Sequence, residues 1–210
     1  MMNRRTTVHS LVALAAAVAV PFGAWAAEEA PDALIKRVSS DVLETIKADP
    51  ALKGGDMGKI NALVDQVVLP HVNFRRMTSA AVGPKWRQAT PAQQDRLQNE
   101  FKQLLMRTYA GALAQVNDQT VVVKPLRMAA GDTDVLVRTE VRGKGEPVPL
   151  DFRLEKKPEG WKIYNFNVLG VWLVETYRTQ FAEELNKGGV DGLINTLASR
   201  SAMPAKAGAK

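Results

Sequence analysis

The sequence predicts an α+β fold, with N-terminal helices, a four-stranded antiparallel sheet, and C-terminal helices packed over one face of that sheet. The first observation behind this prediction is that apolar residues recur with a helical period of 3.6 as far as about Val116. The second is that the period changes to 2 between residues 119 and 168 and then returns to 3.6. The third is a composition of 46% hydrophobic and 24% charged residues over 210 positions, which is typical of a globular chain with one core.

The first 26 residues are typical of a bacterial secretory signal that is removed during export. The signal consists of a basic start, an apolar run and a small-x-small cleavage site, at Arg4-Arg5, residues 11–20 and Ala24-Trp25-Ala26. The apolar run is shorter than the roughly 20 residues that a membrane-spanning helix needs. We therefore expect residues 1–26 to be a signal peptide and the remaining chain to be a soluble periplasmic protein.

Four helices are expected before the sheet, over residues 32–48, 60–68, 73–83 and 90–116. Pro70 ends the second helix because proline cannot continue a helical hydrogen-bond ladder. Asn73 is a suitable N-cap for the third helix, which carries Phe74 and Met77. The longest helix opens at Thr90-Pro91-Ala92-Gln93, a capping box with proline at the first helical position.

Four strands are expected over residues 119–126, 134–142, 147–156 and 161–168. Short connections join them, so successive strands should pair antiparallel. Because one face of each strand is apolar and the other polar, the helices should cover a single face. Two further helices are expected at 172–187 and 190–200, separated by Gly188-Gly189, and residues 201–210 are predicted to be a disordered tail.

The residue types that are missing exclude several kinds of chemistry. The chain has no cysteine, which rules out thiol nucleophiles, disulfides, iron–sulfur clusters and thiolate zinc sites. His71 is the only histidine after the signal, and neither a phosphate-binding loop nor a dinucleotide fingerprint is found. We therefore expect no metal and no cofactor. The formal net charge of +6 falls to +4 when Arg4 and Arg5 leave with the signal, and this modest excess does not indicate a nucleic-acid partner.

Acid–base catalysis remains an alternative. His71 stands at a junction between helices, where a structural or surface role is the more common one. Asp132 and Asp134 lie in an expected turn, and Asp151 and Glu155 lie on the polar face of a strand. A small cone-fold enzyme, an isomerase or hydrolase that uses a pocket carboxylate or His71, is therefore kept as the second interpretation.

Several stretches together resemble one known family. They are VLPHVNF at 68–74, TPAQ at 90–93, LDF at 150–152, WKIYNF at 161–166, GVWLVETYRTQF at 170–181 and GVDGLI at 189–194. In this order they resemble the MlaC family, the periplasmic phospholipid-binding component of the Mla lipid-transport system, also described as a toluene-tolerance auxiliary protein. The resemblance covers nearly all of the chain after the signal, and it implies one MlaC-like domain over residues 27–200.

The resemblance implies a carrier and not an enzyme. Such a protein holds glycerophospholipid acyl chains in an apolar cavity and shuttles the lipid between membranes, which maintains the lipid asymmetry of the outer membrane. The implied partners are an inner-membrane complex of MCE protein, permease and ATPase, and an outer-membrane lipoprotein–porin complex. The bound phospholipid is cargo, no other cofactor is implied, and we expect a monomer.

The apolar faces of the sheet and helices are consistent with such a cavity. We expect the lipid-binding residues to be Phe74, Met77, Phe101, Leu105, Tyr109, Leu113, Val137, Leu150, Phe152, Phe166, Val168, Val171 and Leu173. The same stripes would also form a solid core in any α+β domain of this size. Periodicity alone therefore leaves open whether the interior is hollow.

Three positions depart from the family pattern. Asn73 and Asn165 stand where many members carry aspartate, and Trp172 stands where many carry serine. The two asparagines remove a charge, and the tryptophan adds bulk near the expected mouth of the cavity. These three departures do not change the fold prediction.

Overall fold

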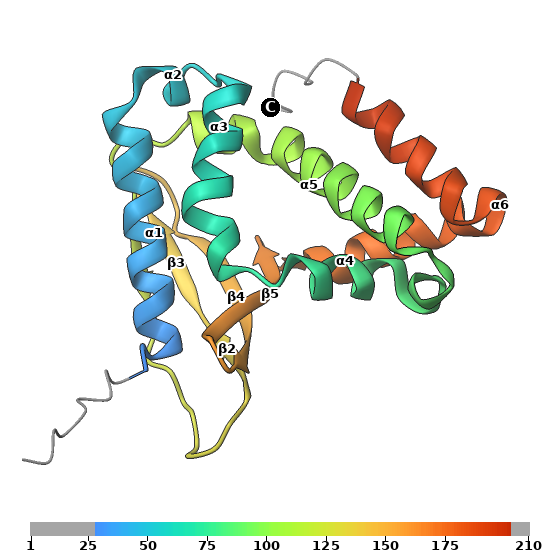
Figure 1. Cartoon of the computed structure of the whole chain (residues 1–210). Coiled ribbons are helices and arrows are strands. Elements are labelled where there is room, and N and C mark those ends of the chain that lie inside the picture. Colours follow the sequence, from blue (N-terminus) through green and yellow to red (C-terminus); the bar gives the residue numbers. More distant parts are fainter. Residues whose placement is uncertain (1–27, 203–210) are drawn as a thin grey trace, which may run out of the picture.

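The computed structural model describes residues 28–202, and within this range it combines helices with one antiparallel sheet, as an α+β fold requires (Figure 1). The helices are α1 (Pro31–Ala48), α2 (Pro50–Lys53), α3 (Met57–Leu63), α4 (Phe74–Val82), α5 (Pro91–Ala114) and α6 (Leu173–Ala202). The expected signal peptide lies outside the described residues. Ser201 and Ala202 form the end of α6, and the rest of the expected tail lies outside the described range.

The expected helix starts are confirmed. The Asn73 side chain accepts a hydrogen bond from the Arg76 backbone N–H at 3.0 Å and caps α4. Thr90 and Gln93 exchange reciprocal side-chain-to-backbone bonds and form the capping box of α5. The last helical region bends at Gly189, whose φ of 62° is not helical, so α6 is two helical segments that meet at the expected glycine pair. The second segment folds back beside α5 (Figure 1).

The helix expected at 60–68 changes its winding partway. After α3, residues Val64–Val68 form a π-helix, η1, and residues Leu69–His71 form a 3₁₀ turn, η2. The Leu69 N–H reaches back to the carbonyl of Val64, the five-residue spacing of a π-turn. Pro70 lies in η2 and cannot donate a hydrogen bond, so the α-helical ladder ends before it.

The sheet has six strands, and the prediction of four was wrong. They are β1 (Thr120–Val123), β2 (Asp134–Val137), β3 (Thr139–Arg142), β4 (Val148–Lys157), β5 (Gly160–Val168) and β6 (Val171–Trp172). The single strand expected at 134–142 is divided at Arg138. The reason is that the Thr139 N–H donates to the Asp151 side chain at 3.1 Å, and its hydroxyl donates to the Leu150 carbonyl, in place of ladder bonds. As a result β2 pairs with the second half of β4, and β3 pairs with its start and with β1.

A bulge in β5 aims two of its side chains at the same face. Leu154 pairs with Ile163 and Phe152 pairs with Phe166, so Tyr164 is extra between the two pairs. Paired residues share a face of the sheet, and the bulge therefore turns both Ile163 and Phe166 inward.

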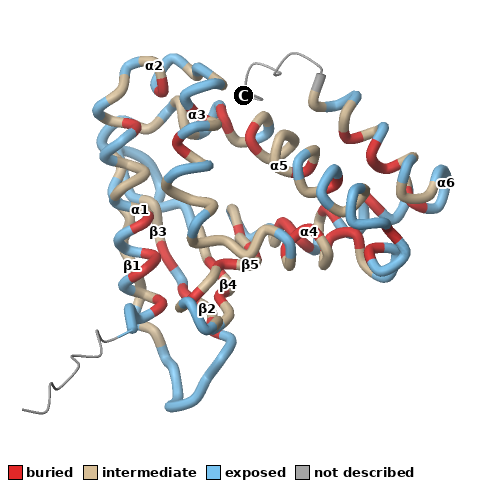
Figure 2. Tube along the Cα trace, in the orientation of Figure 1, coloured by how far each residue is buried: buried red, intermediate tan, exposed pale blue. Residues whose placement is uncertain are grey.

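The buried side chains form three clusters instead of one continuous core. Figure 2 marks the buried positions along the backbone trace of the helices and strands. One lies among α4, α5 and α6 and contains Phe101, and another lies between α1 and the sheet and contains Val137 and Phe152. A third joins α1, α2 and α3 to α5 through Ile46, Ile60 and Met106. Within residues 28–202, no helix combines the length and apolar character needed to cross a membrane.

Candidate functional site

Two apolar pockets lie among the three clusters. The first has a volume of about 550 Å³ and lies between α1, the end of α5 and the sheet. The second has a volume of about 320 Å³ and lies between η1, α4, α5 and the junction of β5 with α6. The two pockets adjoin, since both are lined by Val68, Ala112, Leu113, Leu150 and Phe166.

The walls of both pockets are almost entirely hydrocarbon. Polar side chains in the first pocket are those of Ser39, Gln115, Gln119, Lys144 and Glu146. The second pocket has only Lys102 and the phenol of Tyr109. The Lys102 ammonium forms an ion pair with Asp65 at 2.9 Å, and burial raises the pKa of Tyr109, so its phenol stays neutral. Walls of this kind suit a hydrocarbon ligand, because a polar ligand buried there would lack hydrogen-bond partners.

Most of the predicted lipid-binding residues line one or both pockets. The structure brings together Phe74, Met77, Leu105, Tyr109, Leu113, Leu150, Phe152, Phe166, Val168 and Leu173. These side chains come from α4, α5, β4, β5 and the start of α6, which are far apart in sequence and meet only in the fold.

Three predicted residues lie elsewhere. Phe101 is fully buried in the cluster of α4, α5 and α6, where its ring packs edge-on against Tyr177 and Phe181 at centroid distances of 4.9 and 5.2 Å. Val137 is fully buried between α1 and the sheet. In contrast to these two buried residues, Val171 is exposed to solvent in the short strand β6. None of the three lines either pocket.

One whole wall was missed by sequence reasoning. Residues of α1 line the first pocket, at Ile35, Val38, Ser39, Val42, Leu43 and Ile46. Val64 and Val68 of the π-helix line the second pocket, and Val68 also lines the first. The apolar stripe of α1 was visible as a signal, but a stripe does not indicate whether it faces solid core or open space.

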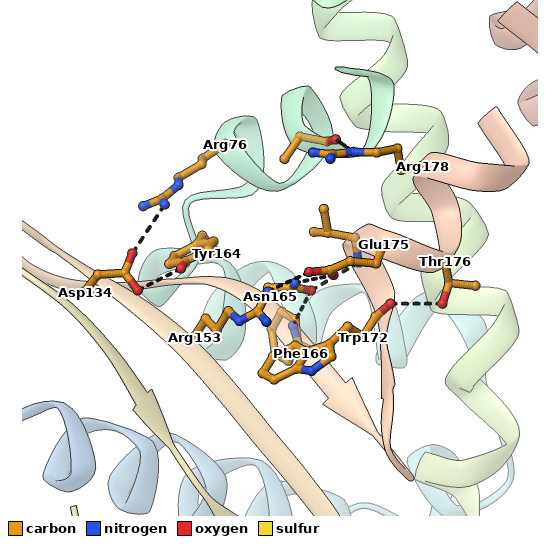
Figure 3. Close-up of polar contacts among 12 residues, drawn as sticks. Arg76, Asp134, Arg153, Tyr164, Asn165, Phe166, Trp172, Glu175, Thr176 and Arg178 are labelled. Atoms are coloured by element: carbon orange, nitrogen blue, oxygen red, sulfur yellow. Dashed lines mark hydrogen bonds and ion pairs between the residues drawn. The ribbon is translucent and has the colours of Figure 1, made fainter. Parts of the chain in front are cut away.

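The outer face of the sheet carries a network of charged and aromatic side chains (Figure 3). The Arg76 guanidinium lies 3.5 Å from the ring centroid of Tyr164 and forms an ion pair with Asp134 at 3.4 Å. The Tyr164 hydroxyl donates to Asp134 at 2.8 Å, and burial together with this bond raises the pKa of Tyr164 to about 12. Similarly, the Arg153 guanidinium lies 3.9 Å from the ring centroid of Trp172. The network faces away from the pockets and stabilises the polar side of the sheet.

This network explains what the three departures from the family pattern do. The Asn165 amide donates to Glu175 at 2.7 Å, while its oxygen accepts from the backbone N–H of Phe166 and of Val174. The Asn73 amide donates to a carboxylate in the same way, to Glu155 at 2.6 Å. Trp172 was expected near the mouth of the cavity, but it packs on Arg153 and lines neither pocket.

The groups considered for catalysis lie outside both apolar pockets. Asp132, Asp134, Asp151 and Glu155 line neither of them. His71 lines a separate polar pocket with Arg37 and Asp41, and burial lowers its pKa, with the charges of Arg37 and Lys162 acting in the same direction. Over the described range 28–202, no group of three or more histidine or acidic side chains is arranged to hold a metal ion.

The fold and the two adjoining apolar pockets are together typical of a protein that binds an apolar ligand. The family model for the MlaC protein matches residues 36–199, more than half of the chain, and the chain belongs to this family. The residue pattern that suggested this family is thereby confirmed.

Individual relatives are consistent with this assignment. The toluene tolerance protein ttg2D of Pseudomonas putida is 26% identical over 79% of this chain and 77% of its own. The intermembrane phospholipid transport system binding protein MlaC of Haemophilus influenzae is 24% identical over 85% of each chain. A phospholipid-binding protein from Ralstonia solanacearum, solved in complex with a phospholipid, is 54% identical with a TM-score of 0.80, over 81% of this chain and 96% of its own.

Proposed function

We propose that this chain is a periplasmic phospholipid carrier that holds the two acyl chains of one diacyl lipid in the adjoining pockets. The observation that carries the proposal is the pair of apolar pockets that share one wall of five residues. The headgroup lies at the surface, where Gln115, Gln119, Lys144 and Glu146 provide the polar edge of the first pocket.

The pocket volumes favour one lipid. A methylene group is close in size to a water molecule, whose share of liquid volume is about 30 Å³, so a chain of 16 carbons needs about 480 Å³. The first pocket, of about 550 Å³, accommodates one such chain, and the second, of about 320 Å³, accommodates most of another. Together the two apolar pockets therefore have room for about two acyl chains, which is one diacyl lipid.

The energetics require walls of this composition. Two acyl chains expose about 30 methylenes, and their transfer to water costs on the order of 25 kcal/mol at about 0.8 kcal/mol each. A carrier must offset nearly all of this cost to extract a lipid. Its pocket must not bind the acyl chains much more tightly than the bilayer does, because the lipid would then never be released. Aliphatic walls with a few polar groups at the edge meet both conditions.

The relatives support this choice of ligand. The Ralstonia solanacearum protein, which shares over half of its aligned residues with this chain, is a phospholipid-binding protein solved with a phospholipid. By the same family membership we propose a periplasmic location and transfer of lipid between the two implied complexes. These are the inner-membrane complex of MCE protein, permease and ATPase, and the outer-membrane lipoprotein–porin complex. The energy that sets the direction of transport comes from the ATPase of the inner-membrane complex and not from the carrier.

We propose no catalytic activity. An acid–base enzyme needs an ionisable side chain next to the reacting part of its substrate. Glu146, the carboxylate of the first pocket, stands at its edge in the exposed turn between β3 and β4, and the second pocket has the paired cation Lys102. No observation favours the cone-fold enzyme over the carrier.

The proposal is tested by measuring bound lipid. Protein purified without detergent should release close to one phospholipid per chain in native mass spectrometry. Protein stripped of lipid should take up the same amount from phospholipid vesicles. A chain that is repeatedly lipid-free and cannot be loaded from vesicles would contradict the carrier function, and four acyl chains per protein would contradict the volume argument.

A further inference from the structure

The tight turn between β5 and β6 contains a leucine in an unusual conformation. Val168 pairs with Val171, so the turn has only two residues, Leu169 and Gly170, and both have positive φ, 55° and 85°. Two-residue hairpin turns of this kind favour Asn-Gly, because asparagine and glycine tolerate positive φ and a bulky residue does not. Among residues 28–202, Leu169 is the only non-glycine residue with positive φ.

The side chain of this strained residue points into solvent. Leu169 is 64% exposed, Val171 is 49% exposed and Val148 is 36% exposed, which makes them three of the four exposed large hydrophobic residues in the described part of the chain. Packing of a buried side chain would explain a strained leucine, but the Leu169 side chain is mostly exposed. Strain that local packing does not require is found at functional positions.

These three residues form one continuous surface, which we call the apolar lip (Val148, Leu169 and Val171). The Leu169 N–H donates to the carbonyl of Pro149, next to Val148, at 3.1 Å. Val148 itself lines the first pocket, and Val168, the pairing partner of Val171, lines the second. The lip is therefore the outward continuation of the pocket walls.

A free cation stands beside the lip. Lys144 lies in the turn between β3 and β4, lines the first pocket, and has no ion-pair or hydrogen-bond partner within residues 28–202. Glu146, in the same turn and also lining the first pocket, has no ion-pair partner within residues 28–202 either. Nearby, Arg142 and Lys124 share the single carboxylate of Glu140, at 2.8 and 2.5 Å. The three basic side chains (Lys124, Arg142, Lys144) and two acidic ones (Glu140, Glu146) leave a net charge of +1 beside the exposed aliphatic side chains.

We propose that the apolar lip and Lys144 dock this chain onto an anionic phospholipid bilayer, with the lip among the acyl chains and Lys144 at the headgroup phosphates. The proposal rests on the carrier function, since the lip matters only if lipid passes through the adjoining pocket. Aliphatic side chains beside basic ones are the combination by which peripheral proteins bind at a membrane interface. Docking there lets acyl chains pass from bilayer to pocket along a continuous apolar surface without crossing water.

The small size of the lip favours a bilayer over a protein partner. A stable protein interface buries about 800 Å² on each side, which is far more than three aliphatic side chains provide. A bilayer needs no complementary shape, and a few inserted side chains give weak, reversible binding. A carrier that must leave the membrane after each transfer requires weak binding of this kind.

The test is Leu169→Asn, measured on the whole chain with vesicles of phosphatidylcholine, with and without equimolar phosphatidylglycerol. Asparagine suits the positive φ, so the variant keeps the fold while it removes the apolar side chain. We expect vesicle binding and lipid transfer between vesicles to fall about fivefold, the loss that corresponds to re-exposing most of one leucine. The phospholipid count of the purified variant should equal that of the wild type.

Two further variants complete the test. Met128→Ser removes an exposed apolar side chain of the loop between β1 and β2, away from the lip, and should bind vesicles as the wild type does. Lys144→Gln should remove most of the preference for vesicles that contain phosphatidylglycerol.

Three results would overturn the proposal. The first is that Leu169→Asn binds vesicles as tightly as the wild type, and the second is that Leu169→Asn and Met128→Ser lose vesicle binding equally. The third is that the wild type binds neither kind of vesicle, which would point to a protein partner. Failure of the carrier function appears in a different measurement, because a wild-type chain that never contains phospholipid overturns both proposals.

Discussion

Replacing Leu113 by aspartate tests the pocket at the point where its two parts meet. Leu113 lies on α5, is half-buried, and lines both pockets, so a bound lipid would contact it with either acyl chain. An aspartate there leaves a carboxylate that water can reach in the lipid-free chain but not in the loaded one.

The expected loss of affinity follows from two contributions. Removing the leucine takes away part of the 1.5–3 kcal/mol, roughly, that a buried leucine side chain contributes. Desolvating a carboxylate costs several kcal/mol even after relaxation, and the half-open position of the residue reduces that cost. A combined loss of about 3 kcal/mol corresponds to roughly a hundredfold weaker lipid binding.

A matched control separates lipid binding from folding. Leu104 lies on the same helix, is also half-buried, and packs against the cluster of α4, α5 and α6 without lining either pocket. Leu104→Asp should therefore lose stability much as Leu113→Asp does but keep its lipid.

The assay combines native mass spectrometry, which counts bound phospholipid per folded chain, with thermal unfolding of the same samples. We expect a nearly lipid-free Leu113→Asp and a loaded Leu104→Asp. Equal lipid content in the two variants, at equal folded fraction, would refute the placement of the acyl chains.

Three other substitutions test separate parts of the structure. Phe101→Ala should destabilise the fold by about 3–5 kcal/mol in denaturant unfolding while the folded fraction still binds lipid, since Phe101 packs in solid core. Leu169→Asn should raise the free energy of unfolding by about 1 kcal/mol, because asparagine tolerates the positive φ that strains leucine, and the midpoint temperature should rise by roughly 2–4 °C. Asn165→Asp should lower the midpoint at pH 7, where its carboxylate would face Glu175, and the deficit should shrink towards pH 4 as one of the pair takes up a proton.

The pH dependence of the native chain has a definite sign at Glu175. Burial alone would raise the pKa of this carboxyl, but hydrogen bonds from Asn165 and Arg153 outweigh it and hold the pKa below its usual value. A carboxyl with a lowered folded-state pKa stabilises the fold above its unfolded value of about 4.3, and the contribution is lost as the pH falls through the folded value. The stabilising contribution of Glu175 is therefore present at neutral pH, and thermal unfolding should show its loss only in acid.

The elements were predictable where a local rule decides them. The capping box at Thr90, the cap at Asn73 and the break at Gly189 depend on residues within one turn of each other, and all three are confirmed. The division of the strand at Arg138 was not predictable in this way. It depends on Thr139 bonding to Asp151 and Leu150 of another strand, a contact that no local pattern contains.

The site was predictable in composition but not in outline. An apolar stripe identifies residues that avoid water, and it does so equally for Phe101, which packs in solid core, and for Leu105, which lines a pocket four residues later. The bulge at Tyr164 also hid part of the site from sequence reasoning, because only the register of β5 with β4 shows that Ile163 and Phe166 lie on the same face of the sheet. A residue lines a pocket instead of packing in solid core when the neighbouring helices and strands lie farther apart, and this spacing is set by the tertiary structure.

The size of the pockets also constrains the form of the chain that has no lipid. A dry apolar void costs about 24 cal/mol per Å³, so the first pocket alone would cost about 13 kcal/mol if it stayed open and dry. That is comparable with the whole stability of a typical domain, about 5–15 kcal/mol. The lipid-free chain must therefore either admit water through the polar edge near Lys144 or bring its three core clusters closer together. Either response reduces the cost of the empty pocket but does not remove it, so release of the lipid stays unfavourable in water. The acyl chains leave only where another apolar phase accepts them and offsets this cost.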